Sequence, residues 1–119
     1  PFVIHGNVIN YGLIDNLPQG GCVEVPVMID RNGFNPCRFG EWPPQMAAVC
    51  RSNMSMIELS VKAALESDRE AAAHALMLDP LTAAVCSPAE IKQMTNELID
   101  AQLDLLPGFA QDSQAEAVS

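Results

Sequence analysis

Between Asn7 and Asp30 the chain reads NVINYGLIDNLPQGGCVEVPVMID, and the expected sheet follows largely from this segment. Two apolar runs flank a corner of turn-forming residues, Leu17-Pro18-Gln19-Gly20-Gly21, and the second run is rich in β-branched side chains. A buried amide or carboxylate costs roughly 1–3 kcal/mol when it lacks a partner. The polar residues within the two runs are therefore expected to be hydrogen-bonded or to line a site; they are Asn7, Asn10, Asp15, Asn16 and Glu24.

Working outward, residues 2–9 and 22–30 are predicted to be strands. Pro26 lies inside the second of them and cannot donate a ladder hydrogen bond, which predicts an edge position or a bulge there. The turn at Asp30-Arg31-Asn32-Gly33 predicts a hairpin, since Asn and Gly both tolerate positive φ. A third strand is expected from about Phe34 to Phe39.

The rest of the chain is predicted to be helical. After Pro43-Pro44, apolar residues recur at spacings of three and four through Leu65. Ser67 with Glu70 forms a capping-box pattern that opens a second helix, which Asp79-Pro80 ends. Ser87-Pro88 opens a third helix, expected to run through Leu106. Short, mainly antiparallel strands in the first third followed by three helices indicate an α+β fold.

The chain has 119 residues, enough for one domain, which we assign to residues 1–109. Residues 110–119 are expected to form a flexible acidic tail. The chain starts at Pro1 inside an apolar run, so we expect it to be a piece of a longer protein.

The net charge of −9 disfavours binding to nucleic acid or to anionic membranes, because phosphate binding needs clustered Lys and Arg. No apolar run approaches the ~20 residues of a membrane span. The four cysteines, Cys22, Cys37, Cys50 and Cys86, form no C-x-x-C pair. They are expected to be reduced thiols packed as small hydrophobic residues, which favours a cytoplasmic location.

The composition and the spacing of residues by themselves predict only a soluble α+β domain. Gly20-Gly21 precedes a strand and not a helix, so it is not a phosphate-binding loop. His74 is expected to be a surface or structural residue. Asn53, on the apolar stripe of the long helix, is either a satisfied core amide or a residue that faces a site.

A longer pattern carries a family resemblance. The run Asn7-x-x-Asn10-x-Gly12-x-Ile14-x-Asn16-Leu17-Pro18, followed by Val23-Glu24-Val25-Pro26, resembles glycoside hydrolase family four, and its α-galactosidase branch in particular. Three further segments strengthen the match: Asp30-Arg31-Asn32-Gly33, Pro43-Pro44, and Met77 to Val85.

The resemblance implies the carboxy-terminal, lactate/malate dehydrogenase-like part of a larger two-domain enzyme. It also implies NAD and Mn²⁺ as cofactors of the intact enzyme, a homo-oligomer, and hydrolysis of α-galactosides by oxidation, elimination, addition of water and reduction. That route departs from the usual pair of carboxylates. By this resemblance the isolated chain should bind neither cofactor and should be inactive.

The resemblance assigns substrate binding to Asn7 and Asn10, because amides both donate to and accept from sugar hydroxyls. Both could instead satisfy backbone at strand ends. Glu24 would orient neighbours or stabilise the strand pair. In the family, the catalytic and metal-binding residues lie upstream of this segment, so Cys22, His5 and Tyr11 receive no such role. We therefore assign no catalytic and no metal-binding residue to this chain, and its cofactor-binding residues are unknown.

Three alternatives stay open. The first is another glycosidase of the same family, acting on an α-glucoside, an α-glucuronide or a 6-phospho-glycoside. The second is a non-catalytic oligomerisation or interaction module with the same fold. The third is the catalytic domain of a lactate- or malate-type dehydrogenase, against which the asparagine-rich motif argues.

Overall fold

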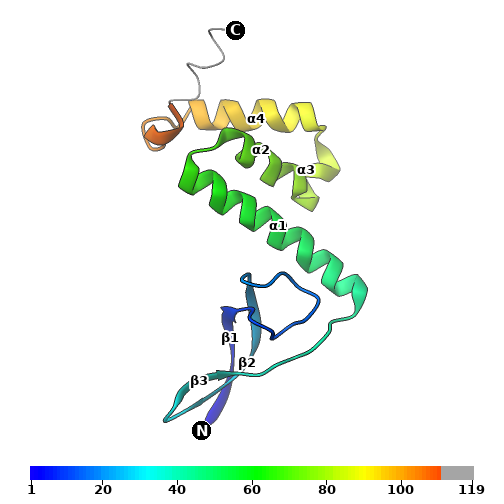
Figure 1. Cartoon of the computed structure of the whole chain (residues 1–119). Coiled ribbons are helices and arrows are strands. Elements are labelled where there is room, and N and C mark those ends of the chain that lie inside the picture. Colours follow the sequence, from blue (N-terminus) through cyan, green and yellow to red (C-terminus); the bar gives the residue numbers. More distant parts are fainter. Residues whose placement is uncertain (111–119) are drawn as a thin grey trace. The chain divides into compact units, whose positions relative to one another are not determined.

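The computed structural model describes residues 1–110 (Figure 1). The chain separates into two compact units, Pro1–Met54 and Ser55–Ser119, and the second is described as far as Ala110. Strands come first and helices follow, which confirms the α+β class. The proposed domain of residues 1–109 stays a prediction, and the expected tail lies outside the described residues apart from Ala110.

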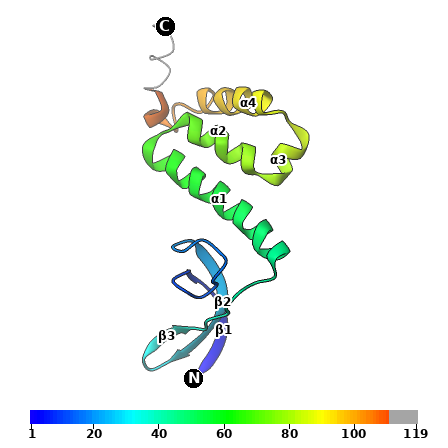
Figure 2. The ribbon, with the colours of Figure 1, turned by 45° about the vertical axis from the view of Figure 1, so that its right-hand side comes forward.

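The first unit contains a three-stranded antiparallel sheet in the order β1-β2-β3 (Figure 2). Its strands are β1 (Phe2–Ile9), β2 (Cys22–Asp30) and β3 (Gly33–Pro36). The first two strands agree with the sequence prediction, whereas β3 ends at Pro36 and not at Phe39. Cys37 still donates its backbone N–H to the Pro26 carbonyl (2.8 Å), after which the chain leaves the sheet.

The prediction for Pro26 is wrong, because β2 is the central strand and Pro26 pairs with His5 without a bulge. The physical reason lies in the direction of its backbone. The Pro26 carbonyl accepts from Cys37, so its ring nitrogen also faces the β3 side. There β3 has already ended at Pro36, so the N–H that Pro26 lacks falls at the end of the ladder, where Cys37 donates to the Pro26 carbonyl and Pro26 returns no bond.

The hairpin between β2 and β3 is confirmed, but its turn differs from the expected one. Asp30 pairs with Gly33, and the Asp30 carboxylate accepts the Asn32 N–H at 2.7 Å. Gly33 alone takes the positive φ, at 106°, while Asn32 does not. The left-handed backbone conformation is therefore taken by Gly33 and not by Asn32. The Asx-type hydrogen bond from the Asn32 N–H to the Asp30 carboxylate stabilises the turn.

The core of the first unit lies on one face of β2. Val23, Val25 and Val27 point into it, and residues from the loop before β2 and from the first helix cover them. The opposite face of the sheet is here called the open face. Its side chains alternate with the core positions and are exposed: Val3, His5, Asn7, Ile9, Cys22, Glu24 and Met28.

Four free cysteines are present, all within the described residues. Cys50 and Cys86 are half-buried, as expected for thiols packed among apolar neighbours. Cys22 and Cys37 are exposed, so the packing prediction is wrong for these two. Cys22 begins β2 on the open face, and Cys37 follows the last residue of β3, so neither points into the core.

Helix α1 (Pro44–Glu66) confirms the long helical pattern after Pro43-Pro44. The Asn53 side chain is half-buried and donates to the Val49 carbonyl at 3.0 Å, so its amide is satisfied by the preceding turn. Small residues, Ala47 and Ala63, are the buried positions of the helix. Much of its apolar stripe is exposed, namely Met46, Val49, Ile57, Val61 and Leu65.

The second unit holds α2 (Arg69–Leu78), α3 (Pro80–Val85), α4 (Pro88–Asp100) and the 3-10 turn η1 (Pro107–Ala110). Two predictions about it are wrong. Asp79-Pro80 ends one helix, as expected, but also begins the short α3, so more than three helices follow the sheet. The last helix ends at Asp100 and not at Leu106, because bonds from Gln102 to Ile99 and from Leu105 to Gln102 tighten the chain into turns.

The capping box at Ser87 and Glu90 is confirmed, whereas the one at Ser67 is displaced by a residue. Asp68 is the N-cap of α2 and accepts the Ala71 N–H at 2.9 Å. Ser67 instead terminates α1 with a φ of 57°, and the Asp68 N–H reaches back to the Ala63 carbonyl at 3.1 Å. This is a Schellman ending, at the position that usually holds glycine.

Replacing Ser67 by glycine should therefore stabilise the helical unit by about 0.5–1 kcal/mol, since glycine takes a left-handed φ without a steric penalty. Urea unfolding followed by circular dichroism measures the gain. Ser60→Gly, in the interior of α1, is the matched control and should cost about 0.5 kcal/mol, the difference between the helix propensities of serine and glycine. A loss of stability in Ser67→Gly would contradict the Schellman assignment.

Acid should weaken the helical unit through its caps. Hydrogen bonds from the Thr82 hydroxyl and backbone N–H hold the pKa of Asp79 below its usual value of 3.8. A carboxylate with a lowered folded-state pKa stabilises the fold above its unfolded pKa, and that stabilisation is lost as the pH falls through the folded value. The free energy of unfolding should therefore decrease below about pH 4, and it should decrease less steeply in Asp79→Asn. Urea unfolding at a series of pH values measures this dependence, and an equal pH dependence in the two proteins would contradict the prediction.

Alanines of α2 and two isoleucines of α4 form the core of the second unit. Arg69 links the start of α2 to the end of α4 and to η1, because its guanidinium donates to the Asp100 carboxylate at 2.6 Å and to the Phe109 carbonyl at 3.2 Å. Phe109 itself is buried. The small alanines allow close packing of the helices, and the arginine holds η1 to this unit.

Candidate functional site: the asparagine loop

Residues 10–21, here called the asparagine loop, join β1 to β2 and are organised by Asn10. The Asn10 side chain is fully buried, at 0% exposure. Its amide nitrogen donates to the carbonyls of Ile14 (2.9 Å), Leu17 (3.3 Å) and Pro18 (3.2 Å). Its amide oxygen accepts the N–H groups of Leu13 (3.1 Å) and Ile14 (2.9 Å). One amide thus serves five backbone groups, in place of the ladder bonds that a strand would supply.

Gln19 closes the loop from the other side. Its side-chain oxygen accepts the Gly12 N–H at 2.7 Å, and its nitrogen donates to the carbonyls of Ile14 (3.3 Å) and Leu17 (3.1 Å). Gly12 and Gly20 have φ values of 75° and 84°, which a side chain would strain. The Gly20 N–H in turn donates to the Asn10 carbonyl. The loop is therefore a preorganised structure and not a loose connection.

Side chains also fix the loop to the segment that follows β3. The Asn16 amide donates to the Trp42 carbonyl at 2.7 Å and accepts the Trp42 N–H at 3.0 Å, a reciprocal pair across 26 residues. Asp15 pairs with Arg38 at 2.5 Å. The Trp42 indole N–H is buried and has no partner within the described residues. The contacts of Asn16 and Asp15 therefore hold the loop against the segment that follows β3.

The two predicted substrate-binding residues lie in different surroundings. Asn10 is buried with its amide engaged by the loop backbone, whereas Asn7 is exposed on the open face, directly opposite Glu24. Glu24 is exposed as well and lies beside a polar neighbour at strand-pair distance. Substrate binding by Asn7 and Asn10 stays a prediction, and the structure adds for Asn10 the task of shaping the loop.

Other candidate side chains are dispersed. His5 lies exposed on the open face, Tyr11 is exposed at the start of the loop, and His74 is exposed on α2. Among residues 1–110, no three His, Cys, Asp or Glu side chains come together as metal ligands. The described residues therefore do not by themselves fit a bound Mn²⁺. Within the same residues, no helix is long and apolar enough to cross a membrane.

Sequence reasoning missed Gln19 and the pairing of Asn16 with Trp42. Gln19 could have been noticed, because it stands between Pro18 and Gly20 in a turn where a long amide reaches back over the loop. The Asn16 contact has no local signal, since its partner is distant in the sequence. Only the packing of the loop on the sheet brings the two together.

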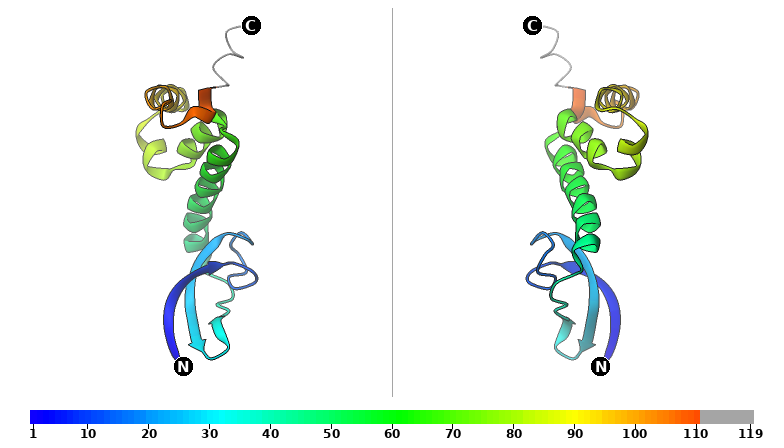
Figure 3. Two further views of the ribbon diagram at one scale, coloured as in Figure 1. Left: turned by 90° about the vertical axis from the view of Figure 1, so that its left-hand side faces the viewer. Right: turned by 90° about the vertical axis from the view of Figure 1, so that its right-hand side faces the viewer.

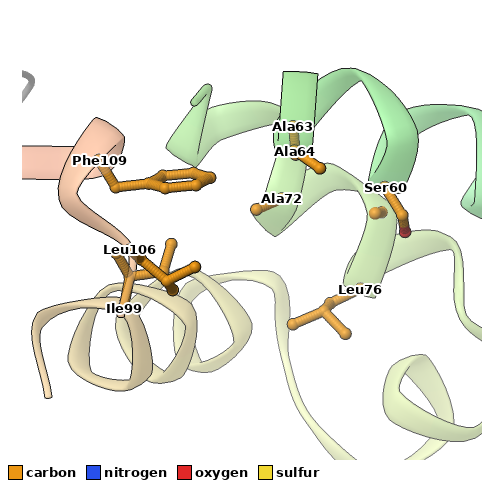
Figure 4. Close-up of a pocket in the computed structure, with 9 residues that line it drawn as sticks. Ser60, Ala63, Ala64, Ala72, Leu76, Ile99, Leu106 and Phe109 are labelled. Atoms are coloured by element: carbon orange, nitrogen blue, oxygen red, sulfur yellow. The ribbon is translucent and has the colours of Figure 1, made fainter. Parts of the chain in front are cut away.

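The second unit contains an apolar cavity of about 380 Å³ (Figure 4). No titratable side chain lines it, so it offers no acid, base or metal ligand. Ser60 is the polar residue of its wall. The lining consists of Ser60, Ala63, Ala64, Ala72, Ala75, Leu76, Ile99, Leu106 and Phe109.

Two solved structures share this fold. A 6-phospho-α-glucosidase from gut microorganisms in complex with NAD and glucose-6-phosphate has a TM-score of 0.74 and 26% identity, over 85% of this chain and 22% of that one. A second 6-phospho-α-glucosidase from gut microorganisms, in complex with NAD and Mn²⁺, has a TM-score of 0.71 and 22% identity, over 91% and 23%. The second likeness concerns the fold alone.

Sequence relatives are more similar. The α-galactosidase of Bacillus subtilis (strain 168) is 42% identical over 92% of this chain and 25% of its own length. The α-galactosidase of Rhizobium meliloti (strain 1021) is 39% identical over 89% and 22%. The chain therefore spans about a quarter of the length of these curated relatives. Residues 1–82 match the model of the family 4 glycosyl hydrolase C-terminal domain, so this chain belongs to glycosyl hydrolase family 4.

Proposed function

We propose that this chain is the carboxy-terminal part of an NAD- and Mn²⁺-dependent α-galactosidase. The observation that carries the proposal is its identity of 42% and 39% with two α-galactosidases, against 26% with the 6-phospho-α-glucosidase. We infer a cytoplasmic enzyme, because free cysteines are typical of reducing compartments. The substrates would be α-galactosides.

In the intact protein, hydrolysis would begin with oxidation of the sugar at C3 and removal of the C2 proton. Elimination of the aglycone, addition of water and reduction of the ketone would follow. Bound NAD would supply the hydride acceptor and donor, with Mn²⁺ polarising the sugar oxygens. No step is assigned to a residue of this chain.

The contribution of this chain would be to position the sugar substrate and to recognise it. The asparagine loop, fixed by Asn10 and Gln19, would form one wall of the sugar site, since a binding wall must be held by interactions of its own. Asn7 has an exposed amide that can donate to and accept from sugar hydroxyls. A polar group in a pocket, left unpaired by the wrong sugar, disfavours that sugar.

The test needs two proteins, the 119-residue chain and the longer protein that contains it. The longer protein should hydrolyse p-nitrophenyl α-galactoside only with NAD, a divalent metal and reducing agent, and p-nitrophenyl β-galactoside serves as the control substrate. The 119-residue chain alone should be inactive. Turnover by the longer protein that is indifferent to NAD and metal would contradict the proposal, and so would turnover by the short chain.

One alternative has an observation in its favour. The similarity to a 6-phospho-α-glucosidase, with a TM-score of 0.74, supports a 6-phosphorylated substrate. The two arginines near the loop are engaged: Arg38 pairs with Asp15, and Arg51 donates to the Asn16 carbonyl. A preference of the longer protein for the 6-phosphorylated α-glucoside over the α-galactoside would decide for this alternative.

A further inference from the structure

The turn of residues 30–33 strengthens the family resemblance but has no part in the proposed function, and it forms the tip of the β2–β3 hairpin (Figure 3). Asn32 is exposed there, and its side chain makes no hydrogen bond within the described part of the chain. Its backbone N–H is bound to the Asp30 carboxylate at 2.7 Å, and the Asn35 amide donates to the Gly33 carbonyl at 3.2 Å. The hairpin itself therefore supplies the contacts that hold the turn.

Gly33 leaves the approach to the Asn32 side chain open. It has a φ of 106°, and apart from the adjoining residues no atom lies within 4 Å of the position that a Cβ on it would take. It also forms the last pair of the β2–β3 ladder, with Asp30. A pair at the end of a ladder opens locally far more readily than a domain unfolds, and each opening releases the Gly33 nitrogen. The nitrogen of Gly33 and the side chain of Asn32 can then react with each other.

The other asparagines lack this combination. Asn32 is the only asparagine of the sequence that precedes a glycine. Asn35 precedes Pro36, whose nitrogen carries no proton and cannot act in the same way. The remaining five are held in β1, in the asparagine loop or in helices: Asn7, Asn10, Asn16, Asn53 and Asn96.

We propose that Asn32 is a site of spontaneous covalent modification, at which the asparagine converts to isoaspartate and aspartate through a succinimide. The Gly33 nitrogen attacks the side-chain carbonyl carbon of Asn32 and closes a five-membered ring. The proton from the Gly33 nitrogen passes to the departing amide nitrogen, which leaves as ammonia. Water then opens the ring: addition at the side-chain carbonyl gives aspartate, and addition at the backbone carbonyl gives isoaspartate. Asparagine is among the thermolabile residues of proteins.

The modification changes both the charge and the backbone of the hairpin. It adds one negative charge to the −9 of the chain, because a carboxylate replaces a neutral amide. The new carboxylate shares the turn with that of Asp30, and like charges at short distance repel. Isoaspartate also carries the chain through its side chain, which adds a backbone carbon and disrupts the pairing of Asp30 with Gly33. The β2–β3 pair is therefore weakened, whereas the β1–β2 pair is left intact.

The modification does not depend on the proposed enzymatic function, so either can fail alone. Ageing of the 119-residue chain in mildly alkaline buffer tests it. Cleavage after Glu24 and Glu41 with a glutamate-specific protease, in mildly acidic buffer, yields residues 25–41, which contain both Asn32 and Asn35. Fragment masses locate the replacement of an amino group by a hydroxyl, and methyl transfer by an isoaspartyl methyltransferase identifies isoaspartate. Asn32 should convert progressively, with isoaspartate as the larger product, while Asn35 in the same peptide stays unchanged.

Two variants separate the chemistry of the turn from general ageing. Asn32→Gln keeps an amide in the turn, but its ring closure needs a six-membered ring, so the product should be lost. Asn7→Gln is the matched control in an exposed strand position, and this variant should age at the rate of the unmodified chain. Urea below the unfolding transition should leave the rate unchanged, because the reaction proceeds from local opening of the turn.

Amide hydrogen exchange of the aged chain supplies a second measurement. Exchange should become faster in β3, while exchange in β1 should not change. The proposal would be overturned by an unmodified Asn32 after ageing, by conversion of Asn32 no faster than that of the other asparagines, or by a rate that follows the globally unfolded fraction. Unaltered exchange of β3 in the isoaspartate form would overturn the effect on the hairpin.

Discussion

Replacing Asn10 by alanine should lower the free energy of unfolding of the first unit by at least about 3 kcal/mol. The substitution removes five hydrogen bonds to backbone groups of the asparagine loop. Gln19 still donates to the carbonyls of Ile14 and Leu17, so the N–H groups of Leu13 and Ile14 and the carbonyl of Pro18 are the groups that lose their side-chain partner. Each buried polar group that loses its bond costs roughly 1–3 kcal/mol, and water entering the space recovers part of that cost. Urea unfolding followed by Trp42 fluorescence is the measurement, since Trp42 packs against this core.

Asn7→Ala is the matched control, an identical change in an exposed strand position of the same segment. Surface substitutions of this kind usually change stability by less than about 0.5 kcal/mol. A similar effect of the two substitutions on stability would contradict the assignment of Asn10 as the organiser of the loop. In the longer protein, the pair separates two tasks: Asn10→Ala should lower activity together with stability, and Asn7→Ala should raise KM in a fully stable protein.

Replacing Ile91 by alanine should destabilise the helical unit by about 2–5 kcal/mol. Ile91 is 1% exposed and is the largest fully buried side chain of α4, where it packs in the core of the second unit. The cost combines the lost transfer free energy with the cavity left among side chains that cannot close over it. Urea unfolding followed by far-ultraviolet circular dichroism measures the change, because most helical residues lie in this unit.

Leu98→Ala on the same helix is the control. Leu98 is 51% exposed, so its truncation should cost less than about 1 kcal/mol. If Leu98→Ala proved the more damaging of the two, α4 would bury a different face from the one described. Both are large apolar residues of the helix predicted after Ser87, and the structure distinguishes them by their burial.

Much of the fold could be predicted from the chain itself. The β-branched runs of residues 2–9 and 22–30, the hairpin at Asp30–Gly33 and the capping box at Ser87 act through local conformational preference. The family followed from a long motif around Asn7 and Asn10, which is specific because many positions must agree. These features need no knowledge of distant contacts.

Other features could not be predicted from the sequence pattern, because they depend on strand pairing or on backbone conformation that the pattern does not specify. The placement of Pro26 in a central strand is possible because β3 stops at Pro36, a fact of strand pairing. The helix after Ser87 ends early because turn bonds replace helical ones beyond Asp100. The residue that ends α1, Ser67, is recognised only from its left-handed φ.

The sequence by itself determined the order of the elements, the α+β class and the family, because local preferences and motif identity reside in neighbouring residues. Tertiary structure alone decided that Asn10 is buried as the organiser of a loop while Asn7, three residues earlier, is exposed. Both are asparagines in one apolar run, with equal local preferences. The difference arises because the loop folds over the face of β2 that carries Val23, Val25 and Val27 and leaves the other face open.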